Sequence, residues 1–150
     1  MNAYADTGFV VTLYKLEITS ERAAALMAKQ TQSVRMSQLG ELEFTNALQL
    51  AVFRKELTPR QAMLKKRLFQ EDVANGIFTI LPVPAATLFA KTAELADRHS
   101  ARLGTRSLDL MHIAAALLLG AETFLSFDER QLKAAKAEGL KVKPSQRPLP

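Results

Sequence analysis

The sequence predicts an α/β domain with three layers, in which helices cover both faces of a central parallel sheet of four or five strands. Short apolar runs typical of buried strands alternate along the chain with longer segments of helical periodicity. The length of 150 residues suits one domain with one sizeable core. No internal repeat or linker divides the chain, so we expect one domain over residues 1–143 and a loose, proline-rich tail over residues 144–150.

The expected strands are short apolar runs that end at polar or turn-forming residues. They cover residues 2–6, 34–37, 78–81, 123–127 and 140–143. The expected helices have capping residues or apolar side chains at helical spacing. They cover about residues 9–16, 20–30, 38–55, 59–75, 85–100, 108–119 and 129–138.

Residues 106–131 carry the clearest pattern in the chain. Ser107 is a good N-cap, and the helix expected after it is apolar on nearly every face, which is typical of a buried helix. Gly120 is expected to end that helix, and a short apolar strand then stops at Asp128. Asp109 and Asp128 therefore lie at the two ends of a buried unit, and Gln131 gives the last helix a start that resembles a capping box.

The helix expected over residues 59–75 begins with Thr58 as N-cap and Pro59 at its first position. Its apolar side chains at helical spacing predict a core face or a partner interface rather than a platform for stacked bases. They are Leu64, Leu68, Phe69 and Val73.

Composition narrows the functional classes. The formal net charge of +5 favours encounter with polyanions, although a merely soluble basic surface explains it equally well. The absence of cysteine excludes disulfide and thiolate chemistry and fits a reducing cytoplasm. The first residues lack a signal-peptide pattern, and the longest apolar run is too short to span a membrane. We therefore expect a cytoplasmic protein without a membrane segment.

Four acidic residues are candidates for a metal site. Asp6 and Asp128 follow expected strands, Asp109 begins a helix, and Glu43 lies on the apolar side of its helix between Leu39, Ala47 and Leu50. Clustered carboxylates repel one another unless a hard divalent cation such as Mg²⁺ or Mn²⁺ holds them.

Each acid also has a purely structural explanation. The three aspartates suit helix caps or helix N-terminal dipoles. Glu43 suits an ion pair with Arg54 or Arg106.

Three segments together form a recognisable series of motifs: YADTGFVVTLY, SQLGELEFTNAL and RSLDLMHIAAALLLGAETFLSFDERQLKAAKAEGLKV. They resemble the successive motifs of PIN-domain ribonucleases, in particular the VapC-type toxins of bacterial toxin–antitoxin pairs. The resemblance implies a PIN-like fold and an endoribonuclease dependent on Mg²⁺ or Mn²⁺, with Asp6, Glu43, Asp109 and Asp128 as its acidic quartet. It also implies a role for Ser126, a small antitoxin as partner and a homodimer.

The first motif departs from the family pattern at Gly8, where a second hydroxyl residue is common, so Thr7 is the remaining candidate for that contact. Gly8 also argues against a phosphatase with an aspartate nucleophile, which usually has a second aspartate at that position. A non-catalytic PIN-like binding module is the other alternative.

Several basic or imidazole side chains lie near the expected site. Arg102, Arg106 and Arg130 are candidates for guiding an RNA backbone. His112 follows Asp109 by three residues, but no cysteine or further histidine nearby completes a zinc set, so a packed, hydrogen-bonded histidine is the favoured interpretation. His99 has less support still as a ligand.

Overall fold

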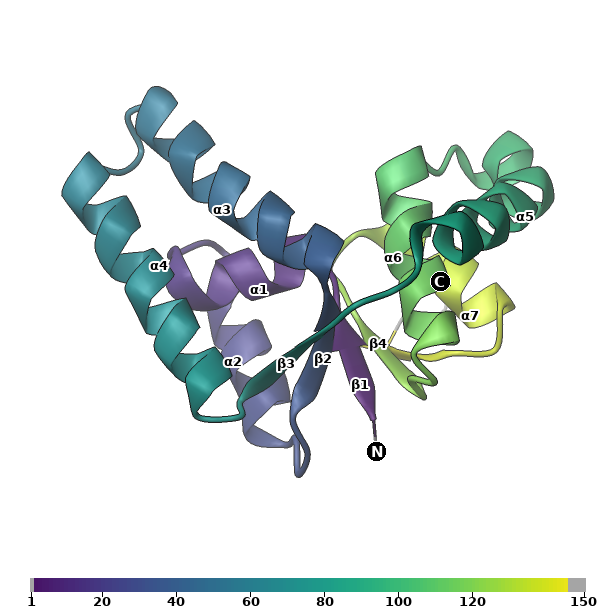
Figure 1. Ribbon diagram of the computed structural model, residues 1–150, viewed down its shortest axis with the longest axis horizontal. Helices are drawn as coiled ribbons and strands as arrows, with labels where there is room; N and C mark the ends of the chain where they lie inside the picture. Colours follow the sequence, from purple (N-terminus) through teal and green to yellow (C-terminus); the bar gives the residue numbers. More distant parts are fainter. Residues whose placement is uncertain (1, 146–150) are drawn as a thin grey trace.

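The computed structural model describes residues 2–145, which form a five-stranded parallel sheet and seven helices in that range (Figure 1). The strands are β1 (Ala3–Ala5), β2 (Val34–Ser37), β3 (Phe78–Leu81), β4 (Thr123–Leu125) and β5 (Lys141–Lys143). The helices are α1 (Thr7–Tyr14), α2 (Ser20–Ala28), α3 (Gln38–Phe53), α4 (Pro59–Ala74), α5 (Ala85–Leu103), α6 (Ser107–Leu118) and α7 (Glu129–Ala137). The predicted three-layer fold is confirmed.

The two faces of the sheet are covered by helices from different halves of the chain. Figure 1 shows α1 to α4 on one side and α5 to α7 on the other. Successive residues of β1 serve both cores, because side chains alternate across a strand. Ala3 and Ala5 pack with the first group of helices, whereas Tyr4 packs with the second.

The strand order β3-β2-β1-β4-β5 places the first strand at the centre of the sheet. The chain first places β2 beside β1 on one side. It later returns to place β4 beside β1 on the other side. This reversal is where ligands bind in open parallel sheets, beyond the carboxyl ends of the strands. Asp6 follows β1 directly, and its N–H donates to the Leu125 carbonyl at 3.1 Å, so the segments after β1 and β4 start side by side.

Two element boundaries differ from the prediction near this edge. The fourth strand ends at Leu125 rather than Phe127, because the Asp128 N–H donates to the Ser126 hydroxyl at 3.0 Å and curls the chain into a turn. The first helix begins at Thr7, since Asp6 caps it.

The buried faces of α3 and α4 also differ from the predicted stripes. Leu50 is exposed on α3, whose buried face is formed by Gly40, Phe44, Leu48 and Ala51. On α4, Leu64 and Leu68 are exposed, while Phe69 and Ala62 are buried.

Other helix ends agree more closely with the sequence patterns. Thr58 and Gln61 form a capping box, and Gly120 has a φ of 70° just past α6. Ser107 is the first residue of α6, whose N-cap is Arg106. Within residues 2–145, no helix has the length and apolar character needed to cross a membrane. Most of the tail predicted over residues 144–150 lies outside the described residues.

Candidate active site

A cavity of about 400 Å³ lies at the carboxyl edge of the sheet, between β1 and β4. All four predicted acids line it: Asp6, Glu43, Asp109 and Asp128. They come from both halves of the chain, because α3 supplies Glu43 and α6 supplies Asp109. The fold therefore brings the four carboxylates to one cavity, as the sequence predicted.

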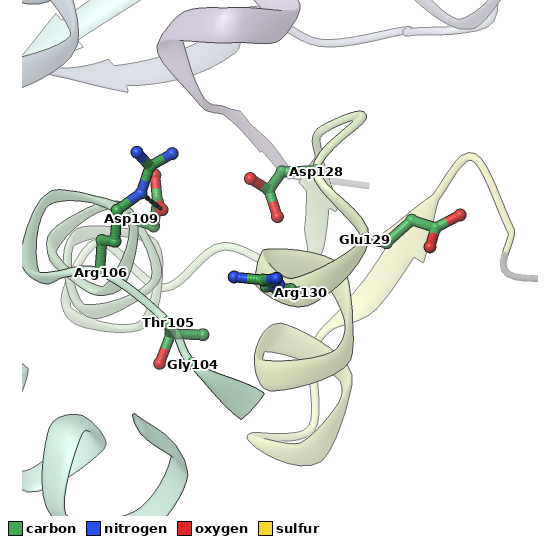
Figure 2. Close-up of a pocket in the computed structure, with 7 residues that line it drawn as sticks. All are labelled: Gly104, Thr105, Arg106, Asp109, Asp128, Glu129 and Arg130. Atoms are coloured by element: carbon green, nitrogen blue, oxygen red, sulfur yellow. Dashed lines mark ion pairs between the residues drawn. The ribbon is translucent and has the colours of Figure 1, made fainter. Parts of the chain in front are cut away.

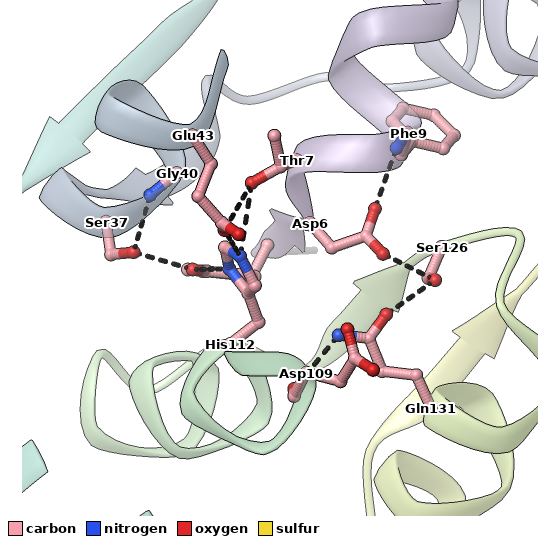
Figure 3. Close-up of polar contacts among 11 residues, drawn as sticks. Asp6, Thr7, Phe9, Ser37, Gly40, Glu43, Asp109, His112, Ser126 and Gln131 are labelled. Atoms are coloured by element: carbon pink, nitrogen blue, oxygen red, sulfur yellow. Dashed lines mark hydrogen bonds and ion pairs between the residues drawn. The ribbon is translucent and has the colours of Figure 1, made fainter. Parts of the chain in front are cut away.

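Asp6 is the most deeply placed of these acids. Its Oδ1 accepts the Phe9 N–H at 2.8 Å, which caps α1, and its Oδ2 accepts from the Ser126 hydroxyl at 2.7 Å (Figure 3). Burial raises the pKa of Asp6 to about 6, against the opposing effect of the Ser126 hydrogen bond, and the charge of Asp128 adds to the rise. The carboxyl group is thus both a helix cap and a charge that the surrounding protein stabilises poorly.

Ser126 links three parts of the site. Its hydroxyl is fully buried and lies 2.7 Å from Asp6 Oδ2 and 2.8 Å from Gln131 Oε1, while it accepts the Asp128 N–H. A hydroxyl has one hydrogen, so Ser126 can donate fully to only one of the two oxygens at a time.

Gln131 is a site residue whose role the sequence pattern did not reveal. The predicted capping box is only half formed: the Gln131 N–H does donate to Asp128 Oδ1 at 3.0 Å. Its side chain, however, does not return to the backbone of residue 128. It is 1% exposed and connects Ser126 Oγ to the Asp109 carbonyl, to which Nε2 donates at 2.9 Å. Gln131 therefore joins α6 to α7 beneath the acids (Figure 3).

Glu43 is bound by uncharged and imidazole partners rather than by an arginine. Its Oε1 accepts the Thr7 hydroxyl at 2.8 Å and lies 2.5 Å from His112 Nε2. Burial alone would raise the pKa of Glu43, but the contacts with His112 and Thr7 outweigh it and hold that pKa below its ordinary value. The suggested pairing with Arg54 or Arg106 is wrong, and His112 is the packed, hydrogen-bonded residue that the sequence favoured. Thr7 does contact an acid of the site.

Asp109 and Asp128 form the shared wall of two cavities. Burial raises the pKa of Asp109, and the nearby charge of Asp128 adds to the rise, while Arg106 opposes both. A second cavity, of about 510 Å³, begins on the other side of these acids and is lined by Arg106 and Arg130 (Figure 2). Nε of Arg106 lies 3.5 Å from Asp109 Oδ2.

The third predicted arginine, Arg102, lines neither of these two cavities. Its Nη2 lies 3.5 Å from His99 Nδ1, and His99 Nε2 in turn lies 2.7 Å from Glu138 Oε2. His99 thus belongs to a buried contact between α5 and Glu138 at the end of α7, and the exposed Arg102 lies at its border.

The donor set of the first cavity fits a hard divalent cation. Among residues 2–145, no three acidic or histidine side chains converge closely enough to hold an ion between them. Mg²⁺, however, commonly retains several waters and binds one or two protein carboxylates, so it does not require such convergence. The raised pKa values of Asp6 and Asp109 reveal carboxyl groups whose ionised forms lack sufficient compensation, and a cation among them would supply it. Asp6, Asp109 and Asp128 are the residues that could hold it.

The fold and this cavity define an α/β domain whose parallel sheet collects carboxylates beyond its carboxyl edge. The sequence profile of the PIN domain matches residues 3–137. The chain belongs to the PIN domain family.

Solved structures show the same fold at low sequence identity. VapC20 of Mycobacterium tuberculosis, a toxin that cleaves the sarcin–ricin loop, superposes with a TM-score of 0.69 at 20% identity, over 95% of this chain and 100% of that one. FitAcB from Neisseria gonorrhoeae gives 0.64 at 20% identity, over 93% and 95%. VapBC2 from Rickettsia felis, solved with a DNA fragment from its promoter, gives 0.66 at 17% identity, over 95% and 98%. No curated protein matches the chain.

Proposed function

We propose that this protein is an endoribonuclease dependent on Mg²⁺ or Mn²⁺ and the toxin of a toxin–antitoxin pair. The observation that carries the proposal is the position of four acids from separate segments in one cavity of a PIN domain. The solved structures with this fold include a toxin that cleaves the sarcin–ricin loop and a complex of the VapBC type, which supports the same assignment.

The reaction is hydrolysis of an RNA phosphodiester that leaves 5′-phosphate and 3′-hydroxyl ends. Asp6, Asp109 and Asp128 would hold the cation, which when bound would supply the positive charge that activates a water and offsets charge on the phosphorus oxygens. Glu43 orients the attacking water, because both of its described protein contacts fall on Oε1 and Oε2 is left available. Ser126 keeps Asp6 in place through its hydroxyl.

The second cavity supports binding of the RNA backbone beside the scissile bond. Arg106 and Arg130 line it together with two of the acids, so a phosphate there would lie next to the proposed cation site. These arginines bind phosphate without selecting a base.

The proposed partners are a small antitoxin and a second copy of the chain, and the proposed compartment is the cytoplasm. Exposed apolar side chains on α3 and α4 support a protein-binding surface; they include Leu42, Phe53, Met63 and Leu68. Coexpression with a neighbouring small reading frame should relieve toxicity, and toxicity that no neighbouring gene relieves would contradict the antitoxin.

Asp109→Asn tests the activity. We expect metal-dependent RNA cleavage to fall by about 100-fold or more, because one of the carboxylates that hold the cation is lost. Circular dichroism should remain native, since Asp109 is half-buried and its backbone contact with Gln131 is retained. Asp97→Asn, which removes an exposed carboxylate from α5, is the matched control and should cleave normally. Full activity in Asp109→Asn would refute the assignment.

A non-catalytic binding module remains the second candidate because no three acids converge within the described residues. Calorimetric titration with Mn²⁺ separates the two. Binding that disappears in Asp6→Asn supports the nuclease, whereas the absence of binding to the native protein supports the module.

A further inference from the structure

A chain of hydrogen bonds runs from the core of the sheet to Glu43. His112 lies on α6 and is 3% exposed, and its Nε2 meets Glu43 Oε1. Its Nδ1 lies 2.7 Å from the Tyr4 hydroxyl, which lies 2.8 Å from Ser37 Oγ. The Gly40 N–H donates to that Ser37 oxygen at 3.3 Å, so the chain begins in the first turn of the helix that carries Glu43.

One arrangement of protons gives every link of this chain a donor and an acceptor and also leaves no hydroxyl hydrogen of the chain without an acceptor. Ser37 accepts from Gly40 and donates to Tyr4, and Tyr4 donates to Nδ1 of His112. Nε2 of His112 then carries the hydrogen and donates to Glu43. Tyr4 is fully buried, and burial raises its pKa, so its hydroxyl retains its hydrogen and can act as this donor.

The other arrangements leave groups without partners. A hydrogen on Nδ1 alone would place the unprotonated Nε2 2.5 Å from the carboxylate of Glu43, and these two acceptors would then compete for the single hydrogen of Thr7, whose Oγ1 lies 3.1 Å from Nε2. An imidazolium would make Tyr4 donate to Ser37, whose own hydrogen would then have no acceptor among residues 2–145. Tyr4 therefore selects the hydrogen-bonding form of His112 that Glu43 requires.

We propose that His112, aligned by Tyr4 and Ser37, is a positioning residue that fixes the Glu43 carboxylate through Oε1 and leaves Oε2 for the reaction. The effect of this arrangement on catalysis rests on the proposed nuclease activity. The hydrogen-bonded arrangement itself does not depend on that activity. Thr7 donates to the same Oε1, so two donors from different helices hold one oxygen. A half-buried glutamate on a long side chain is thereby restricted to one orientation.

Tyr4→Phe breaks this chain with little change in volume. It removes the donor to His112 Nδ1 and keeps the ring that stacks on Phe124 with centroids 5.8 Å apart. We expect kcat to fall by about tenfold with KM nearly unchanged, because loss of a group that orients a site residue lowers activity by roughly 10- to 100-fold. Tyr14→Phe is the matched control: it removes the only other tyrosine hydroxyl, which bonds to Asp72 away from the site, and should retain wild-type kcat.

Nitrogen-15 NMR of the histidine rings tests the chain of hydrogen bonds without reference to activity. The protein has two histidines, so His112→Gln assigns both sets of signals. We expect metal-free His112 to carry its hydrogen on Nε2 in the native protein, and to lose this preference in Tyr4→Phe but not in Tyr14→Phe. An Nδ1–H form in the native protein, or Tyr4→Phe with unchanged kcat, would overturn the inference. If the native protein cleaves no RNA, the proposed function fails and the tautomer measurement alone decides whether the chain exists.

Discussion

Two polar networks support the acids of this site, and they differ in how their hydrogens are shared. In the network of Glu43, the donors Gly40, Ser37 and Tyr4 each have one acceptor, and His112 Nε2 lies 2.5 Å from the Glu43 carboxylate and farther, 3.1 Å, from Thr7 Oγ1. In the network of Ser126, one hydroxyl hydrogen faces both Asp6 and Gln131. The two pKa values also differ: burial raises that of Asp6 against the opposing Ser126 hydrogen bond, whereas the contacts with His112 and Thr7 outweigh burial and lower that of Glu43.

The difference assigns the two halves of the site different tasks. The Glu43 half is complete without a ligand, which suits a residue that must hold one orientation. The Asp6 half is incomplete until something supplies positive charge, which suits a residue that binds a cation. A single acidic cluster thus combines one preformed side and one side that depends on a ligand.

The largest expected effects come from neutralising one acid of each half. Asp6→Asn and Glu43→Gln should each lower cleavage by about 100-fold or more. Their stabilities should move in opposite directions in metal-free protein. Asparagine at position 6 retains the cap to Phe9 and donates to Ser126, which frees Ser126 for Gln131. Glutamine at position 43 loses charge-assisted bonds worth about 1 kcal/mol.

The size of the stability difference between Asp6→Asn and the native protein depends on pH. Folding raises the pKa of Asp6 from 3.8 to about 6, so its contribution to stability is complete below pH 3.8 and is lost as pH rises through 6. Urea unfolding with a chelator should therefore show Asp6→Asn to be more stable than the native protein by roughly 1–3 kcal/mol above pH 7. The difference should disappear near pH 4. If Asp6→Asn and Glu43→Gln destabilise the protein equally at pH 8, the proposed difference between the two halves of the site is wrong.

Gln131→Met tests the second network with an intermediate expected effect. The variant keeps the volume but removes the acceptor for Ser126 and the donor to the Asp109 carbonyl. We expect a loss of about 1–3 kcal/mol in the free energy of unfolding, because these buried groups are left unpaired. Cleavage should fall by roughly tenfold, because the Asp109 backbone loses its contact with α7 and Ser126, which contacts Asp6, loses one of its partners.

Gln61→Met is the control for Gln131→Met. Gln61 is exposed and closes the capping box of α4, so its substitution should reduce stability by only about 0.5–1 kcal/mol and leave cleavage intact. If the two glutamine variants behave alike, Gln131 supports the fold without supporting the site.

The smallest expected effect concerns the second cavity. Arg130→Gln should raise KM for RNA by about threefold to tenfold with kcat unchanged, and the salt dependence of binding should weaken by about one counterion. Fluorescence anisotropy on labelled RNA at several salt concentrations measures this slope. Arg60→Gln, an exposed position on α4, should leave both unchanged. A fall in kcat instead would indicate that Arg130 acts in the chemical step rather than in RNA binding.

The sequence was sufficient for the fold class and for the positions of the acids, because both depend on local patterns. Asp6 and Asp128 are helix caps next to buried strands, and their neighbours in the chain reveal this. Their convergence follows from parallel strands that share an edge.

The partners of these acids could not be predicted in the same way. Glu43 and His112 are 69 positions apart, and nothing in either segment indicates that they meet. The spacing of Gln131 from Asp128 predicts a capping box, yet the Ser126 hydroxyl and the Asp109 carbonyl bind its side chain instead. Local pattern predicts where a polar residue lies, but the choice among its possible partners depends on tertiary packing.

Tyr4 shows how narrowly this small domain constrains one position. It occupies the middle of a three-residue strand, stacks on Phe124 and is fully buried, so any measure of packing would accept phenylalanine there. Its hydroxyl nevertheless reaches His112. A redesign that optimised only the core could therefore preserve the melting temperature while it removed the orientation of Glu43, and a measurement of stability would not reveal the loss.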